Sequence, residues 1–322
     1  MKSAAYGIIS TAVLAALLAI AAITFAESKA ILVQIELDRA GFSCNAIDGS
    51  WGPKSARALS RYASAHALSV DAKTASSPEA VWRALFPRSG NPYRHVAVTQ
   101  ADLDSLVKIP ASAADKARLP AMGYESVAEM FAERGHLSRR ALERLNPKVD
   151  WSDVRVGTRI RIPDFPSMEE ELSAWPRNRP GAPSRPVAKL VRISLSRCEV
   201  SAFDENGRMI ASYPCSIARS KAKLPPHGEL RVSTTVAHPN YTYTPDGPAQ
   251  SRGSRHVWPA GPNCPVGVAW IGLSLPGYGI HGTPRPETIG SAESHGCFRL
   301  SNWNAARLYA MVKPGTKVVV EE

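Results

Sequence analysis

A proline-rich stretch divides this chain into two parts with different local patterns. Between residues 163 and 186 the sequence carries six prolines, three consecutive glutamates and few apolar residues. Proline fixes φ and lacks a backbone N–H, so such a stretch favours extended chain over helix or central strand. Apolar residues before it recur at helical spacing, whereas those after it alternate with polar ones. We therefore expect a linker over residues 164–186 between a mainly helical and a mainly β part.

The first 26 residues predict export. Lys2 precedes an apolar run from Tyr6 to Phe25, and Thr24-Phe25-Ala26 offers small residues at −3 and −1 of a signal-peptide cleavage site. The run also approaches the roughly 20 residues that span a bilayer, so an uncleaved membrane anchor is the alternative. In both cases the remaining chain is expected in the periplasm or cell envelope.

The charge of the chain indicates an anionic partner. Its 322 residues carry a formal net charge of +11, which favours an acidic polymer, a membrane surface or nucleic acid. The basic residues are dispersed, without zinc-finger spacing or an RNA-binding aromatic signature, so we expect no nucleic acid partner. The sequence has no metal ligands at zinc spacing and no nucleotide-binding loop, so neither a metal nor a cofactor is expected.

Residues 28–88 predict a small helical module. Apolar residues recur at helical spacing in three segments, 31–40, 53–68 and 78–85. A turn, Asp48-Gly49-Ser50-Trp51-Gly52-Pro53, precedes the second segment. This pattern resembles the peptidoglycan-binding domain of three short helices, whose hallmark is Asp-Gly-x-x-Gly before an Ala-rich helix. Asp48 and Gly49 could also be no more than turn residues.

Residues 89–118 are rich in small residues and predict a second linker. In residues 119–163, helical segments at 124–132 and 139–145 precede Asn146-Pro147 and an alternating strand that ends in Gly-Thr-Arg-Ile-Arg-Ile-Pro. This order is similar to a LysM module, a small α+β binder of N-acetylglucosamine polymers. The first strand of that module is weak in this sequence, which leaves glycan binding open.

The last region, residues 187–322, predicts a mainly antiparallel β domain with one short helix at 302–312. Alternating segments predict strands at 190–195, 197–203, 209–217, 225–232, 268–273 and 317–320. Asn206-Gly207 is typical of a two-residue hairpin loop. With a two-residue loop, the residue numbers of each facing pair add up to 413, so Cys198 faces Cys215. We therefore predict a disulfide between these two cysteines. A three-residue loop would shift the register by one residue.

A cysteine lies close in sequence to two histidines near the C-terminus, within Gly279-Ile280-His281-Gly282-Thr283 and Ser294-His295-Gly296-Cys297-Phe298-Arg299. Disulfide pairing of the chain's five cysteines would leave at least one thiol free. Cys297 is the candidate, because an adjacent imidazole can take its proton and make it a nucleophile. Gly296 would let a substrate carbonyl approach backbone N–H groups.

These two motifs resemble the signature of the L,D-transpeptidase (YkuD-type) catalytic domain, Ile-His-Gly-Thr followed by Ser-His-Gly-Cys-hydrophobic-Arg. Two upstream segments, Pro225-Pro226-His227-Gly228 and Gly261-Pro262-Asn263-Cys264-Pro265-Val266-Gly267, stand where that family has Thr-Pro-Thr-Gly and Gly-Pro-x-Asn-Pro-x-Gly. The resemblance covers residues 187–321. It implies a multidomain protein whose catalytic domain follows a helical module and a LysM-like module.

The resemblance also implies catalytic roles. Cys297 would attack the amide carbon of a peptidoglycan stem peptide and form a thioester, with His281 as general base and then general acid. The carbonyl of Gly282 would hold the productive tautomer of His281.

Further motif residues would bind the substrate and its developing charge. Backbone N–H groups of His295, Gly296 and Cys297 would form the oxyanion hole. The side chain of His295 would either polarise the site or only shape the loop. Arg299 would bind stem carboxylates, and Ser294 would supply a local hydrogen bond.

The implied reaction cuts a tetrapeptide stem before its terminal D-Ala and transfers the acyl group to an amine, giving 3–3 cross-links in cell-wall biogenesis. Hydrolysis of the same thioester would instead make an L,D-carboxypeptidase or endopeptidase. An inactive murein-binding scaffold is the third alternative, against which His281 and Cys297 argue. Cys264 departs from the family pattern, where Asn is usual, and could pair with Cys44 or Cys297 under oxidation.

Overall fold

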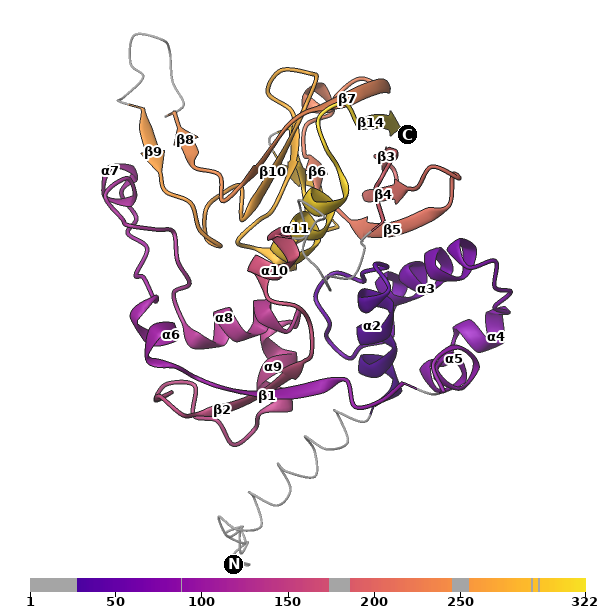
Figure 1. Ribbon diagram of the computed structural model, residues 1–322, viewed down its shortest axis with the longest axis horizontal. Helices are drawn as coiled ribbons and strands as arrows, with labels where there is room; N and C mark the ends of the chain where they lie inside the picture. The colour runs from indigo at the N-terminus through magenta and orange to yellow at the C-terminus, as the bar shows by residue number, and fades with distance from the viewer. Residues whose placement is uncertain (1–27, 88, 174–185, 245–254, 291, 295) are drawn as a thin grey trace, which may run out of the picture.

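The computed structural model describes residues 28–322 apart from 88, 174–185, 245–254, 291 and 295 (Figure 1). The predicted signal peptide or anchor, residues 1–26, lies outside this range and stays a prediction. None of the helices in the described range combines the length and apolarity needed to cross a bilayer. A large sheet forms one half of the molecule, and helices with a two-stranded sheet form the other (Figure 1).

The three helices predicted at the start of the chain are present, with one additional short helix. They are α2 (Lys29–Arg39), α3 (Pro53–Ala65), α4 (Ala72–Ala75) and α5 (Pro78–Leu85). Gly41 ends the first with a φ of 89°, a conformation that glycine adopts without a Cβ penalty. The side chain of Asp48 accepts hydrogen bonds from Gln34 Nε2 at 2.9 Å and from Ser50 N–H at 2.8 Å. Asp48 therefore holds the turn before α3.

The predicted order of helix, helix and strand is also present, as α8 (Val127–Arg134), α9 (Arg139–Leu145) and β2 (Arg159–Pro163). The segment expected to be a linker differs, because it contains β1 (Tyr93–Ala97), α6 (Gln100–Asp104) and α7 (Ala113–Lys116). β1 pairs antiparallel with β2, from Tyr93 opposite Pro163 to Ala97 opposite Arg159. Only one residue of β1 is buried, so its apolar alternation is weak in the sequence.

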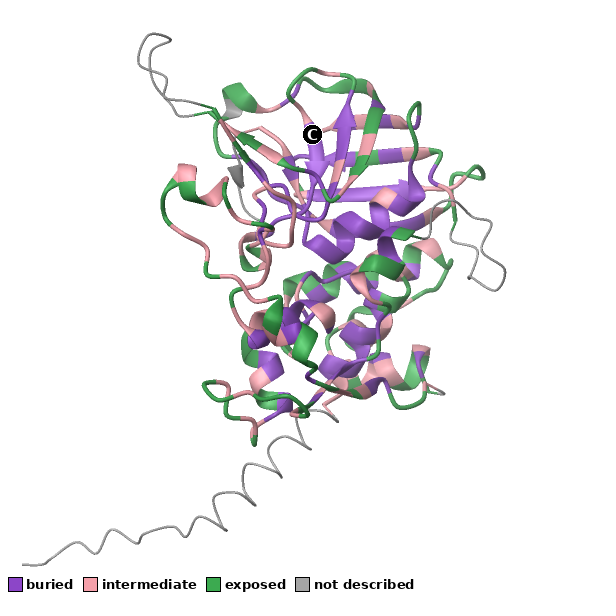
Figure 2. Cartoon of the chain, turned by 60° about the vertical axis from the view of Figure 1, so that its left-hand side comes forward, coloured by how far each residue is buried: buried purple, intermediate pink, exposed green. Residues whose placement is uncertain are grey.

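One hydrophobic core unites the two N-terminal segments. Its buried side chains include Ile31 and Leu37 of α2, Phe131 of α8, Leu142 of α9 and Ile162 of β2. Buried residues also line the region where this half meets the large sheet (Figure 2). The helical and LysM-like segments therefore pack as one body.

The large sheet has eight strands in the order β13-β11-β10-β7-β14-β3-β4-β5. Its strands are β3 (Leu190–Ser194), β4 (Glu199–Phe203), β5 (Met209–Pro214), β7 (Gly228–Ala237), β10 (Ala269–Leu273), β11 (Gly279–His281), β13 (Phe298–Arg299) and β14 (Lys317–Glu321). The pairs β14–β3 and β11–β13 are parallel, and the others are antiparallel. Two small sheets pair β6 (Ile217–Ala218) with β12 (Ala292–Ser294) and β8 (Tyr241–Tyr243) with β9 (His256–Trp258).

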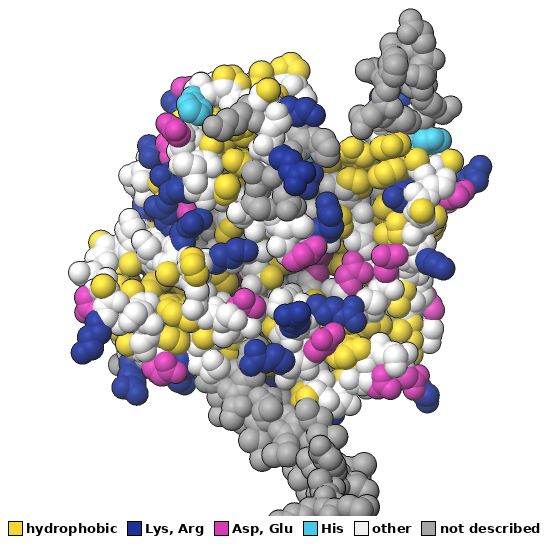
Figure 3. All heavy atoms as spheres, turned by 180° about the vertical axis from the view of Figure 1, so that it is seen from behind, with side chains coloured by type: hydrophobic (Ala, Val, Ile, Leu, Met, Phe, Trp, Pro, Cys, Tyr) yellow, Lys and Arg dark blue, Asp and Glu magenta, His cyan; other side chains and the backbone are white. Residues whose placement is uncertain are grey.

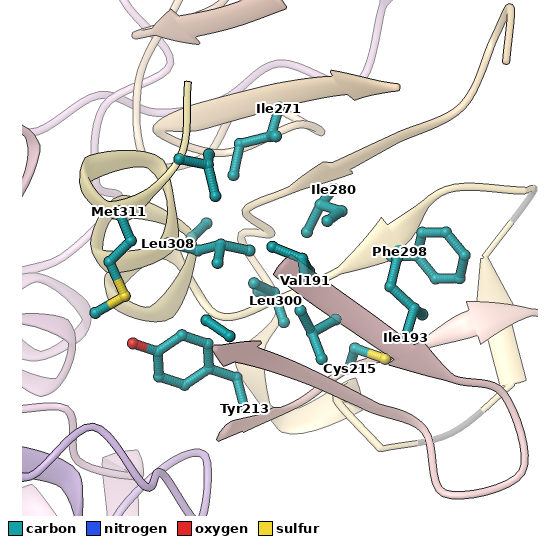
Figure 4. Close-up of a cluster of buried hydrophobic side chains, with 14 of the residues drawn as sticks. Val191, Ile193, Tyr213, Cys215, Ile271, Ile280, Phe298, Leu300, Leu308 and Met311 are labelled. Carbon is teal, nitrogen blue, oxygen red and sulfur yellow. The ribbon is translucent and has the colours of Figure 1, made fainter. Parts of the chain in front are cut away.

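The predicted C-terminal helix is α11 (Asn302–Met311), and its apolar side chains belong to the core of the sheet domain. Leu308 and Met311 of α11 share this core with Ile271 of β10 and Ile280 of β11 (Figure 4). The helix thus anchors one end of the sheet to the rest of the molecule.

The hairpin of β4 and β5 has the predicted register but not the predicted disulfide. Pairs from Glu199–Pro214 to Ala202–Ala211 sum to 413, and a bulge near the loop compensates for a longer turn. Cys198 and Cys215 are nevertheless both free thiols. Cys198 has a φ of 49°, and its Sγ lies 3.6 Å from the carbonyl oxygen of Leu195. This left-handed turn directs the thiol toward Leu195, so the disulfide prediction is wrong for this structure.

The predicted proline-rich linker contains α10 (Met168–Ser173), which lies between the two halves (Figure 1). Glu171 of α10 is buried and accepts a hydrogen bond from Arg307 Nε at 3.1 Å. Arg307 Nη1 also contacts Asp38 Oδ1 of α2 at 2.6 Å, and His136 Nδ1 lies 2.9 Å from the same oxygen. Burial alone would raise the pKa of Asp38, but the charges of Arg307 and His136 hold that pKa well below its usual range.

We expect Arg307→Ala to lower the free energy of unfolding by about 3–5 kcal/mol, because it leaves Asp38 and Glu171 buried without their cation. Denaturant titration followed by circular dichroism measures this change. Arg155→Ala is the matched control, since Arg155 pairs with Asp153 on the surface and should change stability by at most about 1 kcal/mol. Equal losses in the two variants would contradict the structural role of the buried network.

Candidate active site

Two parallel strands at the edge of the large sheet bring residues of the two motifs together in space. Ile280 of β11 lies opposite Phe298 of β13, and His281 lies opposite Arg299. Successive side chains of a strand point to opposite faces. Ile280 and Phe298 are fully buried in the core (Figure 4), so His281 and Arg299 lie on the other face. Cys297 directly precedes β13, and the charge of Arg299 acts on the pKa of both Cys297 and His281.

His281 is buried and held by two neighbours. Its Nδ1 lies 2.6 Å from the carbonyl oxygen of Gly282, and its ring stacks on Trp270 with centroids 5.6 Å apart. A carbonyl oxygen only accepts hydrogen bonds, so Nδ1 carries the hydrogen and Nε2 remains able to take a proton. Burial lowers the pKa of His281 to about 4. The imidazole is therefore neutral at neutral pH.

Cys297 is partly exposed, and its Sγ lies 3.6 Å from the carbonyl oxygen of Gly277. Burial raises the pKa of its thiol, while a backbone hydrogen bond at Gly279 and the charge of Arg299 oppose that rise. The thiol is therefore protonated at rest, and the imidazole of His281 on the neighbouring strand is neutral. This combination suits a thiol that loses its proton as a substrate carbonyl is attacked.

The loop before Cys297 is described only in part. Gly296 has a φ of 152°, a conformation that strains residues with a side chain. His295 lies outside the described residues, and Ser294 is placed by its backbone alone, as the last residue of β12. The oxyanion hole and the hydrogen bond predicted for Ser294 thus remain predictions.

Asn302, at the start of α11, supports the site and was not predicted from the sequence. Its Oδ1 accepts a hydrogen bond from Val268 N–H at 3.3 Å and packs against Gly267 and Gly282, where an added Cβ would collide with this oxygen. Its Nδ2 lies 3.1 Å from each carboxylate oxygen of Glu133 in α8. The sequence motifs contain Gly267 and Gly282, but they give no sign that Asn302, on another element, packs against both glycines.

A cavity of about 470 Å³ lies beside the site, between the two halves of the molecule. The sheet half contributes Thr283, Arg285 and Arg299 to its lining, and the N-terminal half contributes Lys116 and Glu129 among others. The sequence did not reveal this wall, because Lys116 lies in the segment expected to be a linker and Glu129 in a separate predicted module.

The second thiol near the site differs from Cys297 in its environment. Cys264 is fully buried, its Sγ lies 3.5 Å from the carbonyl oxygen of Pro239, and burial raises its pKa to about 11. Cys44 lies in the N-terminal core, and all five cysteines are free thiols. The pairings considered for Cys264 are therefore not formed. Among the described residues, no cluster of three His, Cys, Asp or Glu side chains could hold a metal ion.

Known proteins share the sequence of the catalytic half. Residues 188–320 match the YkuD family, described as the L,D-transpeptidase catalytic domain. A protein named L,D-transpeptidase YkuD from Bacillus licheniformis is 28% identical over 201 residues, which cover 62% of this chain and 94% of that protein. L,D-transpeptidase YqjB from Bacillus subtilis is 31% identical over 113 residues, covering 33% of this chain and 58% of that protein.

Solved structures give matches of lower coverage. An L,D-transpeptidase from Mycobacterium tuberculosis is 19% identical, with a TM-score of 0.31, over 41% of this chain and 57% of that chain. The segment that matches the family contains β11, β13 and both sequence motifs. Residues 188–320 are accordingly a YkuD-type L,D-transpeptidase catalytic domain.

Proposed function

We propose that this protein is an exported peptidoglycan L,D-transpeptidase that works through a thioester on Cys297. The observation that supports the proposal is the edge pairing of β11 with β13, which sets His281 opposite Arg299, two residues after Cys297 in the sequence. The Nδ1 contact with Gly282 leaves Nε2 of His281 as the proton acceptor.

Acylation follows from these groups. The thiol proton of Cys297 moves to His281 Nε2 as Sγ attacks the carbonyl carbon of the stem peptide bond. Backbone N–H groups around Gly296 would stabilise the oxyanion, at about 3 kcal/mol for each donor. When the tetrahedral intermediate collapses, the C–N bond breaks, and His281 returns the proton to the departing D-Ala amine.

Transfer of the acyl group to the acceptor follows the steps of acylation in reverse order. The acceptor amine attacks the thioester carbon and gives its proton to His281, the C–S bond breaks, and the Cys297 thiolate regains that proton. An amine on a second stem would give a 3–3 cross-link, whereas water would give hydrolysis. The neutral state of His281 at neutral pH supports its role as base in both steps.

The charges beside the site fit a peptide that carries both carboxylates and an amine. Arg285 and Arg299 lie on the catalytic wall of the cavity, and Glu125 and Glu129 lie on the opposite wall. A guanidinium group binds a carboxylate through two parallel hydrogen bonds. We therefore assign Arg299 to a stem carboxylate.

The N-terminal half would hold the polymer near this site. Its resemblance to peptidoglycan-binding and LysM modules supports this role. The net charge of +11 also favours an anionic polymer. Basic side chains on the face in Figure 3 are scattered among acidic ones, which suits diffuse attraction better than one localised anion site.

Incubation of the purified protein with tetrapeptide muropeptides tests the proposal, with products identified by mass spectrometry. We expect cross-linked dimers, and none from Cys297→Ala or His281→Ala. Tripeptides without dimers would favour the carboxypeptidase alternative. Unchanged substrate with the folded wild-type protein would contradict transfer and hydrolysis alike, and the inactive murein-binding scaffold would be the remaining alternative.

The two thiols near the site should differ in reactivity. A carbapenem should add covalently to the wild-type protein and to Cys264→Ala, but not to Cys297→Ala, because Cys264 is buried with a pKa of about 11. Intact-protein mass spectrometry measures the adduct. An adduct lost in folded Cys264→Ala would show that the nucleophile is misassigned.

The low pKa of His281 predicts an unusual acid limit. Acylation requires neutral His281, so kcat/KM should stay nearly constant from pH 7 to pH 5 and fall about tenfold per pH unit below about 4. Stopped-flow acylation by a carbapenem measures this profile, with circular dichroism at each pH as a control for folding. A fall in kcat/KM that begins near pH 6.5, at about the ordinary pKa of histidine, would contradict the buried neutral imidazole.

A further inference from the structure

We infer that Glu133 of the N-terminal half is a positioning residue for His281, and that it acts through Asn302 and Gly282. The inference rests on the proposed role of His281 as the catalytic base. It assigns a part in the reaction to a residue outside the YkuD-type domain, which begins at residue 188.

Glu133 fixes which way the amide of Asn302 points. The glutamate is buried in α8, and both of its oxygens lie 3.1 Å from Asn302 Nδ2. The carbonyl oxygen of Pro262 accepts from the same nitrogen at 3.0 Å. Burial raises the pKa of Glu133 to about 7, but the side chain offers an acceptor oxygen in its charged and its protonated form. The carbonyl of Pro262 only accepts hydrogen bonds, so the amide nitrogen must face both groups. The amide oxygen is thereby turned to the opposite side, toward the catalytic loops.

That oxygen meets the backbone on which His281 depends. It accepts a hydrogen bond from Val268 N–H and lies so close to Gly267 and Gly282 that neither position has room for a Cβ. The carbonyl of Gly282 is the acceptor for His281 Nδ1 at 2.6 Å. Direct contacts therefore connect Glu133 to the imidazole through two intermediate residues.

The connection matters because the Asn302 oxygen fills the space beside Gly282 that a side chain would occupy. If Asn302 could rotate, the backbone of Gly282 would lose this contact, and the His281 tautomer with a free Nε2 would be less populated. A displacement of about 1 Å at a reacting group can cost about 100-fold in rate. Tyr124 supports Glu133 in turn, since its hydroxyl donates to Glu133 Oε1 at 2.8 Å.

Three variants test the inference in the full chain. Glu133→Ala removes the side-chain acceptors of Asn302 Nδ2 and leaves only the Pro262 carbonyl. Glu133→Gln keeps an oxygen that can accept from Asn302, and Glu143→Ala alters an exposed glutamate of α9 that pairs with Arg139. Three quantities are measured: the acylation rate constant with a carbapenem, the apparent KM for the same compound, and the ¹⁵N shifts of the His281 ring nitrogens, assigned with His281→Ala.

We expect Glu133→Ala to lower the acylation rate constant roughly 10- to 100-fold with little change in KM, and to reduce the fraction of His281 with its hydrogen on Nδ1. Glu133→Gln should recover most of the rate, and Glu143→Ala should match the wild type. If Glu133→Ala does not fold, Glu133→Met, which preserves the side-chain volume, takes its place.

A wild-type rate and tautomer in folded Glu133→Ala, together with an inactive His281→Ala, would overturn the positioning role alone. Loss of activity with the tautomer unchanged would also overturn it, because the effect would then not pass through His281. Full activity in His281→Ala would instead overturn the proposed function on which the inference rests.

Discussion

The ion pair between Arg307 and Asp38 is the interaction on which the arrangement of the two halves depends. Arg307 belongs to the helix that anchors the large sheet, and Asp38 belongs to the first helix of the N-terminal half. A charge buried at such a boundary is tolerated only when its partner is in place, so the halves must be docked in one orientation. The position of α8, and with it Glu133, follows from that orientation.

Docking also shapes the space beside the candidate active site. The cavity near Arg299 has one wall from each half, so neither half forms it alone. A chain whose N-terminal half served only as a flexible tether would leave this face of the site open to solvent. The docked arrangement instead encloses a cavity with Arg285 and Arg299 on one side and Lys116, Glu125 and Glu129 on the other.

Local signals in the sequence predicted most of the elements and the family resemblance of the last region. The helix that begins at Pro78 after Ser77 needs no distant partner, and the motifs around His281 and Cys297 lie in the segment that matches the YkuD family. The strand β1 was missed, because its partner β2 follows more than sixty residues later. Nothing in the sequence indicated that Glu171 and Glu133 are buried and paired. Their partners, Arg307 and Asn302, belong to α11 and contact them only when the two halves are packed together.

The pairing of β1 with β2 has a consequence for how such proteins could be assembled by gene fusion. A recombination breakpoint between residues 97 and 159 would separate the two strands and leave each with an unpaired edge. The shared core of α2, α8 and α9 extends this restriction back to the first helix. We therefore expect that a fusion keeps a folded N-terminal half only when it includes the whole half, although the sequence resembles two successive modules.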